Sequence, residues 1–203
     1  MTRMRVELPV VIALGSNLPG DHGDREQLLR LAVQAIDALS GVRVTAASGI
    51  VETPALKLDG VDENAPSYLN AVVLARAALS PEMLLGALHG IEAALGRVRQ
   101  EVWGDRTIDL DLIDFGGLRR ASEEITLPHP RAWQRAFVLA PWRQVQPDAV
   151  LPKADGTGSA RVADLLLAAQ GRAPEERVTP FPAEPLFTAS GTGGVSADPA
   201  TVS

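Results

Sequence analysis

The chain has 203 residues, of which 46% are hydrophobic and 22% charged, a composition typical of a globular protein with one sizeable core. The formal net charge of −6 argues against a general nucleic-acid-binding protein, because such a protein carries a basic surface. The lack of cysteine excludes disulfides, thiolate metal sites and cysteine nucleophiles. No apolar run has the length of a membrane span or the features of a signal sequence, so we expect a cytoplasmic protein.

Four segments have the composition or the alternation of β-strands: residues 8–14, 42–53, 67–78 and 107–115. The first is a continuous apolar run that ends at Gly15, as a central strand entering a turn does. In the third, Tyr68 and Asn70 fall on one face and Leu69 and Ala71 on the other. The fourth begins with strict alternation of polar and apolar residues.

Apolar residues at helical spacing predict helices over 24–39, 80–95 and 160–170, with a short helical region between residues 130 and 146. Helices interleaved with strands that can pair antiparallel indicate one α+β domain, in which helices pack on a mostly antiparallel sheet. We expect this domain to span residues 1–171. Residues 172–203 are rich in Pro, Gly, Ser and Ala without periodicity, and we expect them to form a disordered tail.

A pair of aspartates at the start of the fourth strand is the most informative feature. Asp109 and Asp111 are two residues apart, so they project from the same face of a strand. Paired carboxylates are stable when a hard cation such as Mg²⁺ lies between them; a solvated sheet face is the alternative. Asp114, three residues further on, is expected on the opposite face and in a structural role.

Three arginines precede the aspartate pair: Arg97, Arg99 and Arg106. Arginine binds phosphate oxygens in a bidentate manner, and a loop with these side chains would lie over the strand that carries the aspartates. Acids for a metal and arginines for phosphates are the recurring parts of a phosphoryl-transfer site, which favours that site over a solvated face. Trp103, in the same loop, either stacks on a flat ligand or anchors the loop.

Two further positions have roles that the residues alone leave open. His129 lies between two prolines, where it can either donate to a phosphate or stabilise a turn. Tyr68, the only tyrosine, shares a strand face with Asn70, and the two offer a ring for stacking and an amide for the edge of a heterocycle. Cross-strand packing is the simpler role for Tyr68.

Taken together, these motifs resemble the 6-hydroxymethyl-7,8-dihydropterin pyrophosphokinase family. The matching segments follow the family's order and include Ala-Leu-Gly-Ser-Asn-Leu at 13–18, Val-Glu-Thr-Pro at 51–54, Tyr-Leu-Asn-Ala at 68–71, Arg-Thr-Ile-Asp-Leu-Asp at 106–111 and Leu-Pro-His-Pro-Arg at 127–131. The resemblance implies a ferredoxin-like fold, a three-layer α-β-α sandwich. It also implies transfer of pyrophosphate from ATP to the hydroxymethyl group of the dihydropterin, which gives AMP and the pterin diphosphate in folate biosynthesis.

The resemblance also implies a role for each matching residue. Asp109 and Asp111 would hold two Mg²⁺ ions, and Arg97 and Arg106 would complete the catalytic group by binding phosphates. The side chains expected at the nucleotide are Arg99, Trp103, Arg106, His129 and Arg135. Those expected at the pterin are Thr53, Pro54, Tyr68, Asn70 and Phe137, with Tyr68 and Phe137 on the two sides of the ring.

Three departures from the family pattern fall in the arginine-rich loop, and the first is a stretch between Arg99 and Trp103 that is shorter than in the best-known members. Val102 stands where a basic residue is frequent, and Asp105 stands where proline is frequent, so this loop would hold phosphate less firmly. The alternatives are a nucleotidyltransferase, which would release pyrophosphate rather than AMP, and a nucleotide-sensing or scaffold protein without turnover. We expect a monomer that binds ATP and a dihydropterin, and neither nucleic acid nor a membrane.

Overall fold

The computed structural model describes residues 6–57, 60–62, 65–96, 107–152, 157–174 and 177–188. Its main sheet contains β1 (Leu8–Ser16), β2 (Val42–Ala47), β3 (Val51–Thr53), β6 (Tyr68–Ala77), β7 (Asp109–Phe115) and β12 (Thr179–Pro180). The strand order is β12-β3-β6-β1-β7, and β2 pairs with β6 next to β3. Each pairing in this sheet is antiparallel.

Three small ladders lie outside the main sheet. They pair β4 (Ala55–Lys57) with β5 (Gly60–Asp62), β8 (Arg120–Ala121) with β9 (Thr126–Leu127), and β10 (Val150–Pro152) with β11 (Ser159–Arg161).

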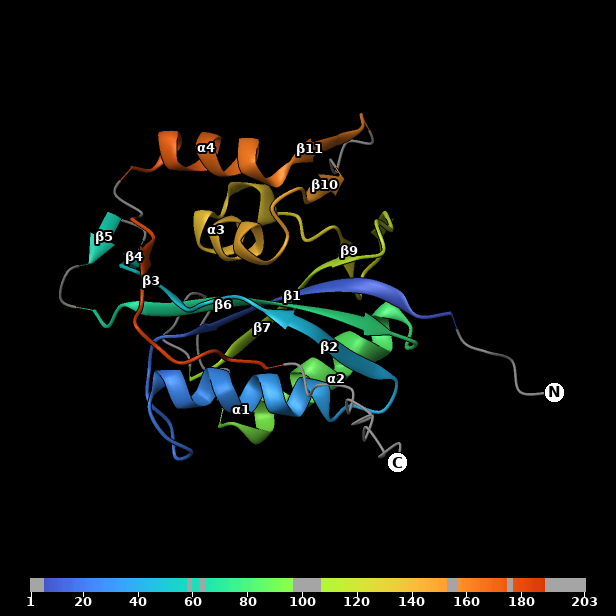
Figure 1. Cartoon of the computed structure of the whole chain (residues 1–203), viewed down its shortest axis with the longest axis horizontal. Coiled ribbons are helices and arrows are strands. Elements are labelled where there is room, and N and C mark those ends of the chain that lie inside the picture. The colour runs from blue at the N-terminus through green and yellow to red at the C-terminus, as the bar shows by residue number, and fades with distance from the viewer. Residues whose placement is uncertain are drawn as a thin grey trace, which may run out of the picture.

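Helices cover both faces of the main sheet (Figure 1). The helices are α1 (Arg25–Asp37), α2 (Pro81–Ala94), the short 3₁₀ helix η1 (Ala132–Gln134), α3 (Ala136–Val145) and α4 (Val162–Arg172). Helices α1 and α2 lie on one face, whereas α3 lies on the other face with α4 stacked outside it. The expected three-layer sandwich around an antiparallel sheet is therefore confirmed. No helix in the described ranges is long and apolar enough to cross a membrane.

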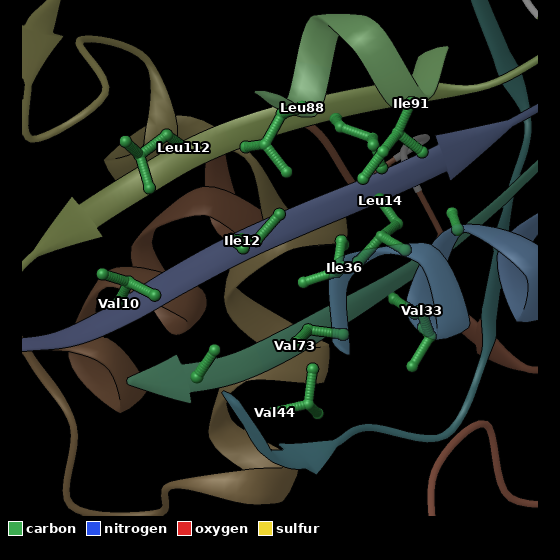
Figure 2. Packing of buried hydrophobic residues seen from close by; sticks show 14 of the residues in the cluster. Val10, Ile12, Leu14, Val33, Ile36, Val44, Val73, Leu88, Ile91 and Leu112 are labelled. Carbon is green, nitrogen blue, oxygen red and sulfur yellow. The ribbon is translucent and has the colours of Figure 1, made fainter. Parts of the chain in front are cut away.

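The central strand β1 supplies side chains to both layers of the core. Val10, Ile12 and Leu14 pack against α1 and α2 (Figure 2), whereas Val11 and Ala13 point toward α3. This is the two-residue alternation of a strand that is buried on both faces. Burying an aliphatic side chain of this size contributes roughly 1.5–3 kcal/mol, so the sheet is a rigid platform for the residues at its end.

Capping residues define the ends of the two helices on the first face. The Asp24 carboxylate accepts a hydrogen bond from the N–H of Gln27, and the Ser80 hydroxyl accepts one from the N–H of Met83, the usual arrangement at a helix start. Helix α2 ends at Ala94, and Gly96 follows its C-cap with a φ of +87°, the left-handed conformation that glycine adopts at low cost after a helix. The chain then enters residues 97–106, which lie outside the described residues.

The predicted strand over 42–53 is divided into β2 and β3. The interruption falls at Ser48, whose hydroxyl accepts a hydrogen bond from the N–H of Val72 on β6. A side chain that bonds to backbone in this way competes with regular strand pairing. The break sets β3 apart as a three-residue strand at the edge of β6.

The C-terminal region also differs from its prediction. Thr179–Pro180 pair with β3, and Leu186 is buried in the core beneath α1 and α2. Residues 177–188 are thus part of the fold, although they were expected to belong to a disordered tail. Their order comes from the sheet edge and the core that receive them, which a local composition does not reveal. Residues 189–203 of the expected tail lie outside the described residues.

Candidate active site

Asp109 and Asp111 lie on the face of β7 that is turned toward α3. Their neighbours Leu110 and Leu112 belong to the core on the opposite face, so the predicted alternation is confirmed. Both aspartates are partly exposed, and they stand opposite Gly15 and Ala13 of β1. The positions beside the two carboxylates on β1 are thus a glycine and an alanine, the two smallest residues.

A β-bulge follows the aspartate pair. The register between β1 and β7 shifts after Ile12, so that Val11 stands opposite Asp114 instead of Ile113. The extra residue, Ile113, joins the core under α3, and Asp114 consequently shares the face of Asp109 and Asp111. The expectation that Asp114 lies on the opposite face is wrong, because a bulge breaks the two-residue period.

Asp114 makes a local contact. One carboxylate oxygen, Oδ2, accepts a hydrogen bond from the N–H of Gly117 at 3.1 Å, which fixes the turn after β7. The other oxygen, Oδ1, is buried and has no hydrogen-bond partner among the described residues. Burial raises the pKa of this carboxyl, and the N–H groups of Gly117 and Phe115 oppose that shift.

Two basic side chains approach Asp111 from the segment that precedes α3. Arg135 Nη1 donates a hydrogen bond to Asp111 Oδ2 at 3.0 Å, and His129 Nε2 lies 3.8 Å from the same oxygen. The side chains of Asp111 and Arg135 are only 32% and 23% exposed, so water screens this pair incompletely. The structure thus brings His129 and Arg135, both predicted at the nucleotide, to the predicted metal-binding carboxylate.

Backbone hydrogen bonds fix the position of His129 and determine which ring nitrogen carries its proton. Its N–H donates to the carbonyl of Ile113, and its Nδ1 accepts a hydrogen bond from the N–H of Arg131 at 3.2 Å. Burial lowers the pKa of this imidazole, and Arg135 acts in the same direction while Asp111 opposes it. In the neutral ring, Nδ1 is the acceptor, so the proton is on Nε2 and faces the site.

The second part of the site lies across the sheet from the aspartates. Asn70 of β6 is directly opposite Gly15 of β1, and Gly15 is opposite Asp109 of β7. Neighbouring strands are about 5 Å apart, so Asn70 and Asp109 are separated by about 10 Å. This span is comparable to the length of a fused two-ring heterocycle. Asn70 and the aspartates can therefore contact opposite ends of one such ligand.

Asn70 is held in place on two sides. Its side-chain amide donates a hydrogen bond to the Thr53 hydroxyl at 3.0 Å, and both residues are buried. A Cβ atom at Gly15 would lie 3.1 Å from the Asn70 carbonyl oxygen, so glycine provides the space that this oxygen occupies. Among the residues that the structure describes, one N–H and the carbonyl oxygen of the amide are left to pair with the edge of a ligand.

The remaining residues predicted at the pterin come from β6, from the end of β3 and from α3, elements that pack against one another. Tyr68 pairs with Thr53 across β3 and β6, on the same face as Asn70, and it is half-buried like Pro54. Helix α3, which carries the half-buried Phe137, packs against β6 and β3. The Arg135 guanidinium lies 5.5 Å from the centre of the Phe137 ring, which links the pterin group of residues to the acidic group.

The site residues predicted in the arginine-rich loop fall in a part of the chain that the structure does not describe. Arg97, Arg99, Trp103 and Arg106 lie outside the described residues. The residues on either side of that segment are described: Gly96 follows the end of α2, and Thr107 leads into β7 with its methyl group against Gly20. Leu95 and Thr107, two described residues on either side of that segment, both lie close to Gly20.

Glu92 is a residue that sequence reasoning did not assign to the site. This carboxylate of α2 is 2% exposed and accepts a hydrogen bond at 2.7 Å from the N–H of Leu110, the residue between the two aspartates. It therefore fixes the backbone from which both carboxylates project. The signal was present in the sequence, because position 92 falls on the apolar stripe of its helix with Leu88 and Ile91, where a charged residue needs a buried partner.

Comparison with known proteins places the chain in a family. The family model of 7,8-dihydro-6-hydroxymethylpterin-pyrophosphokinase (HPPK) matches residues 11–147, which include every described residue of the site. The chain belongs to the HPPK family. Two relatives named 2-amino-4-hydroxy-6-hydroxymethyldihydropteridine pyrophosphokinase agree with this assignment.

The protein from Methylorubrum extorquens is 39% identical over 140 residues, which are 69% of this chain and 84% of that protein. The protein from Bacillus subtilis is 40% identical over 151 residues, which are 72% of this chain and 86% of that protein.

Solved structures extend the agreement to the fold. The crystal structure of wild-type Plasmodium falciparum HPPK-DHPS superposes with a TM-score of 0.60 and covers 86% of this chain at 12% identity. The chain spans 47% of that longer protein. At this identity the likeness concerns the fold alone, and it agrees with the three-layer sandwich described above.

Proposed function

We propose that this chain carries out the reaction of the HPPK family on the sheet face between Asn70 and Asp111. The chain is a pyrophosphokinase that acts on a hydroxymethyldihydropterin in folate synthesis. ATP is the proposed donor, so that the products are AMP and the 6-hydroxymethyl-dihydropterin diphosphate. The observation that supports this site best is the arrangement of Asn70, Gly15 and Asp109 in one row across three strands.

The acidic residues fit Mg²⁺. Two partly exposed carboxylates on one strand face are the number that Mg²⁺ takes from proteins when phosphate oxygens and water complete its octahedron. Among the described residues, no group of three or more His, Cys, Asp or Glu forms a metal cage, which also suits an ion that is bound together with a nucleotide. We propose that Asp109 and Asp111 hold two such ions, which supply positive charge to the phosphates when bound.

The remaining residues position the two substrates. Asn70 and Thr53 would pair with the edge of the pterin, with Tyr68 and Phe137 on its faces. His129, through the proton on Nε2, and Arg135, through guanidinium N–H groups other than the one on Asp111, would contact phosphate oxygens. The proposed roles of Arg97, Arg99, Trp103 and Arg106 in gripping the nucleotide complete this group.

The chemistry requires little from any single side chain. The substrate hydroxyl attacks the β-phosphorus of ATP in line, and AMP leaves. Positioning the alcohol and neutralising charge on the bridging oxygen are the main contributions of the protein. No described side chain is needed as a general base.

The test is incubation of the chain with ATP, Mg²⁺ and 6-hydroxymethyl-7,8-dihydropterin, followed by chromatography. AMP and the pterin diphosphate should appear in equal amounts, and neither should form when the pterin is omitted. Release of pyrophosphate instead of AMP would show a nucleotidyl transfer and would refute the proposal. We also propose that the chain acts in the cytoplasm as a monomer, without nucleic acid or a membrane. Sedimentation at working concentration tests the oligomeric state.

A further inference from the structure

Residues 177–188, which we call the C-terminal strap, run past the edge of the sheet from one face to the other. The strap follows α4, passes the edge at β3 and continues along α1 (Figure 1). It lies beyond residues 11–147, where the HPPK family model matches. The strap is thus outside the part of the chain that the family model matches, and it touches the sheet beside residues that we assign to the pterin.

The first contact of the strap is a ladder on β3. Thr179 stands opposite Glu52 and Pro180 opposite Val51, and the N–H of Phe181 donates to the carbonyl of Ile50 at 3.0 Å. Hydrogen-bonded and non-hydrogen-bonded pairs alternate along an antiparallel ladder. Pro180 therefore falls at a non-hydrogen-bonded position, where its missing N–H removes no bond from the sheet.

The second contact anchors the far end of the strap. Arg30 of α1 donates hydrogen bonds to the carbonyls of Glu184 and Pro185, at 2.7 and 2.9 Å. Leu186 is 8% exposed and belongs to the core under α1 and α2, and Phe187 packs against the same core. Both ends of the strap are therefore fixed, one by backbone pairing and the other by apolar burial.

Glu52 connects the strap to the rest of the pocket. Its backbone carbonyl accepts a hydrogen bond from the Thr179 hydroxyl, and its side chain accepts one from the hydroxyl of Ser67, which in turn is bonded by Arg25 of α1. Glu52 precedes Thr53, and Ser67 precedes Tyr68. The strap is thus linked to both strands at the residues just before two proposed pterin contacts.

We propose that the C-terminal strap is a positioning element for the pterin pocket, which it acts on by holding β3 in register with β6. This inference rests on the proposed function. A strand of three residues paired on one side only has few interactions that resist local opening, and the strap supplies the second side. A pocket held in its binding geometry before the ligand arrives binds more tightly, because less ordering remains to be done on binding. Asp111, His129 and Arg135 lie on β7 and before α3, so binding of ATP should depend little on the strap.

The test uses point variants of the full chain with matched controls. Arg30→Gln removes the two bonds to the strap together with the ion pair between Arg30 and Glu26. Its control is Arg76→Gln, since Arg76 likewise donates to a backbone carbonyl and pairs with a carboxylate, both of Glu7. Leu186→Ala removes the buried anchor, and its control is Ile125→Ala, since Ile125 is 7% exposed in the same core. Thermal unfolding of all four variants separates local effects from a general loss of stability.

Two measurements decide the proposal. Hydrogen exchange of the ligand-free variants should show faster exchange of the Val51–Thr53 amides for the two strap variants than for their controls. Steady-state kinetics should show a KM for the pterin raised about three- to tenfold by lost preorganisation, with kcat and the KM for ATP within about twofold of wild type. An unchanged pterin KM, or β3 exchange no faster than in the controls, overturns the proposal. Absence of transfer by the wild-type chain would refute the proposed function instead, and the exchange measurement, made without ligand, would still show whether the strap holds β3.

Discussion

Replacement of Asp111 by asparagine should separate catalysis from folding. The variant Asp111→Asn keeps the shape of the side chain and removes its charge. In the folded chain this loses an ion pair with Arg135 at 3.0 Å, and such a partly exposed pair contributes on the order of 1 kcal/mol or less. It also removes the repulsion from Asp109 on the same strand face, which acts in the opposite direction. The free energy of unfolding should therefore change by less than about 1 kcal/mol.

The effect on turnover should be much larger. An amide is a poor ligand for a hard cation compared with a carboxylate, and loss of a metal-anchored phosphate clamp should lower kcat on the order of 10³-fold, or about 4 kcal/mol of transition-state stabilisation.

The assay is AMP formation at saturating Mg²⁺ and substrates, together with thermal unfolding. The matched control is Asp114→Asn, which neutralises a carboxyl group on the same face of the same strand and should leave kcat within about twofold of wild type, because Asp114 contacts a local turn. A kcat for Asp111→Asn within about tenfold of wild type, with the fold intact, would refute the metal assignment.

Three further predictions follow from the site. Gly15→Ala should displace the Asn70 carbonyl oxygen, 3.1 Å from the new Cβ, and raise the KM for the pterin about five- to tenfold, the equivalent of one hydrogen bond; an unchanged KM would contradict the role of Asn70. Tyr68→Ala should weaken pterin binding about tenfold through lost stacking while ATP binding persists, and titration calorimetry with each ligand would reveal the opposite pattern. For Asp114, whose pKa is raised by burial, the folded chain binds the proton more tightly than the unfolded chain, so stability falls as pH rises from the ordinary pKa through the raised one. The stability of Asp114→Asn relative to wild type should therefore increase over that window, and a flat difference between pH about 3 and 7 would contradict the shift.

Much of the acidic part of the site could be predicted because it depends on a local period. Alternation at the start of β7 was sufficient to place Asp109 and Asp111 on one face. The same reasoning was wrong for Asp114, because Leu112 and Ile113 are both apolar and either can face a core in a sheet covered on both sides. A bulge between two apolar residues leaves no mark in the hydrophobic pattern.

Contacts between segments that are distant in the sequence could not be predicted from the sequence. The bond from Arg135 to Asp111 depends on how the chain after β9 crosses above β7, and no local propensity specifies that path. The strap is a similar case, since residues 177–188 have the composition of a tail and become ordered only where β3 and the core receive them. Tertiary context commonly overrides local preference in this way.

The row formed by Asn70, Gly15 and Asp109 has a consequence for how the protein acquires activity. Its members come from strands that are far apart along the chain and meet only when the sheet is fully assembled. Pairings of large sequence separation form late and slowly in folding. During refolding, enzyme activity should therefore return at the same rate as the last strand pairs with the sheet. Regain of turnover would then report completion of the sheet.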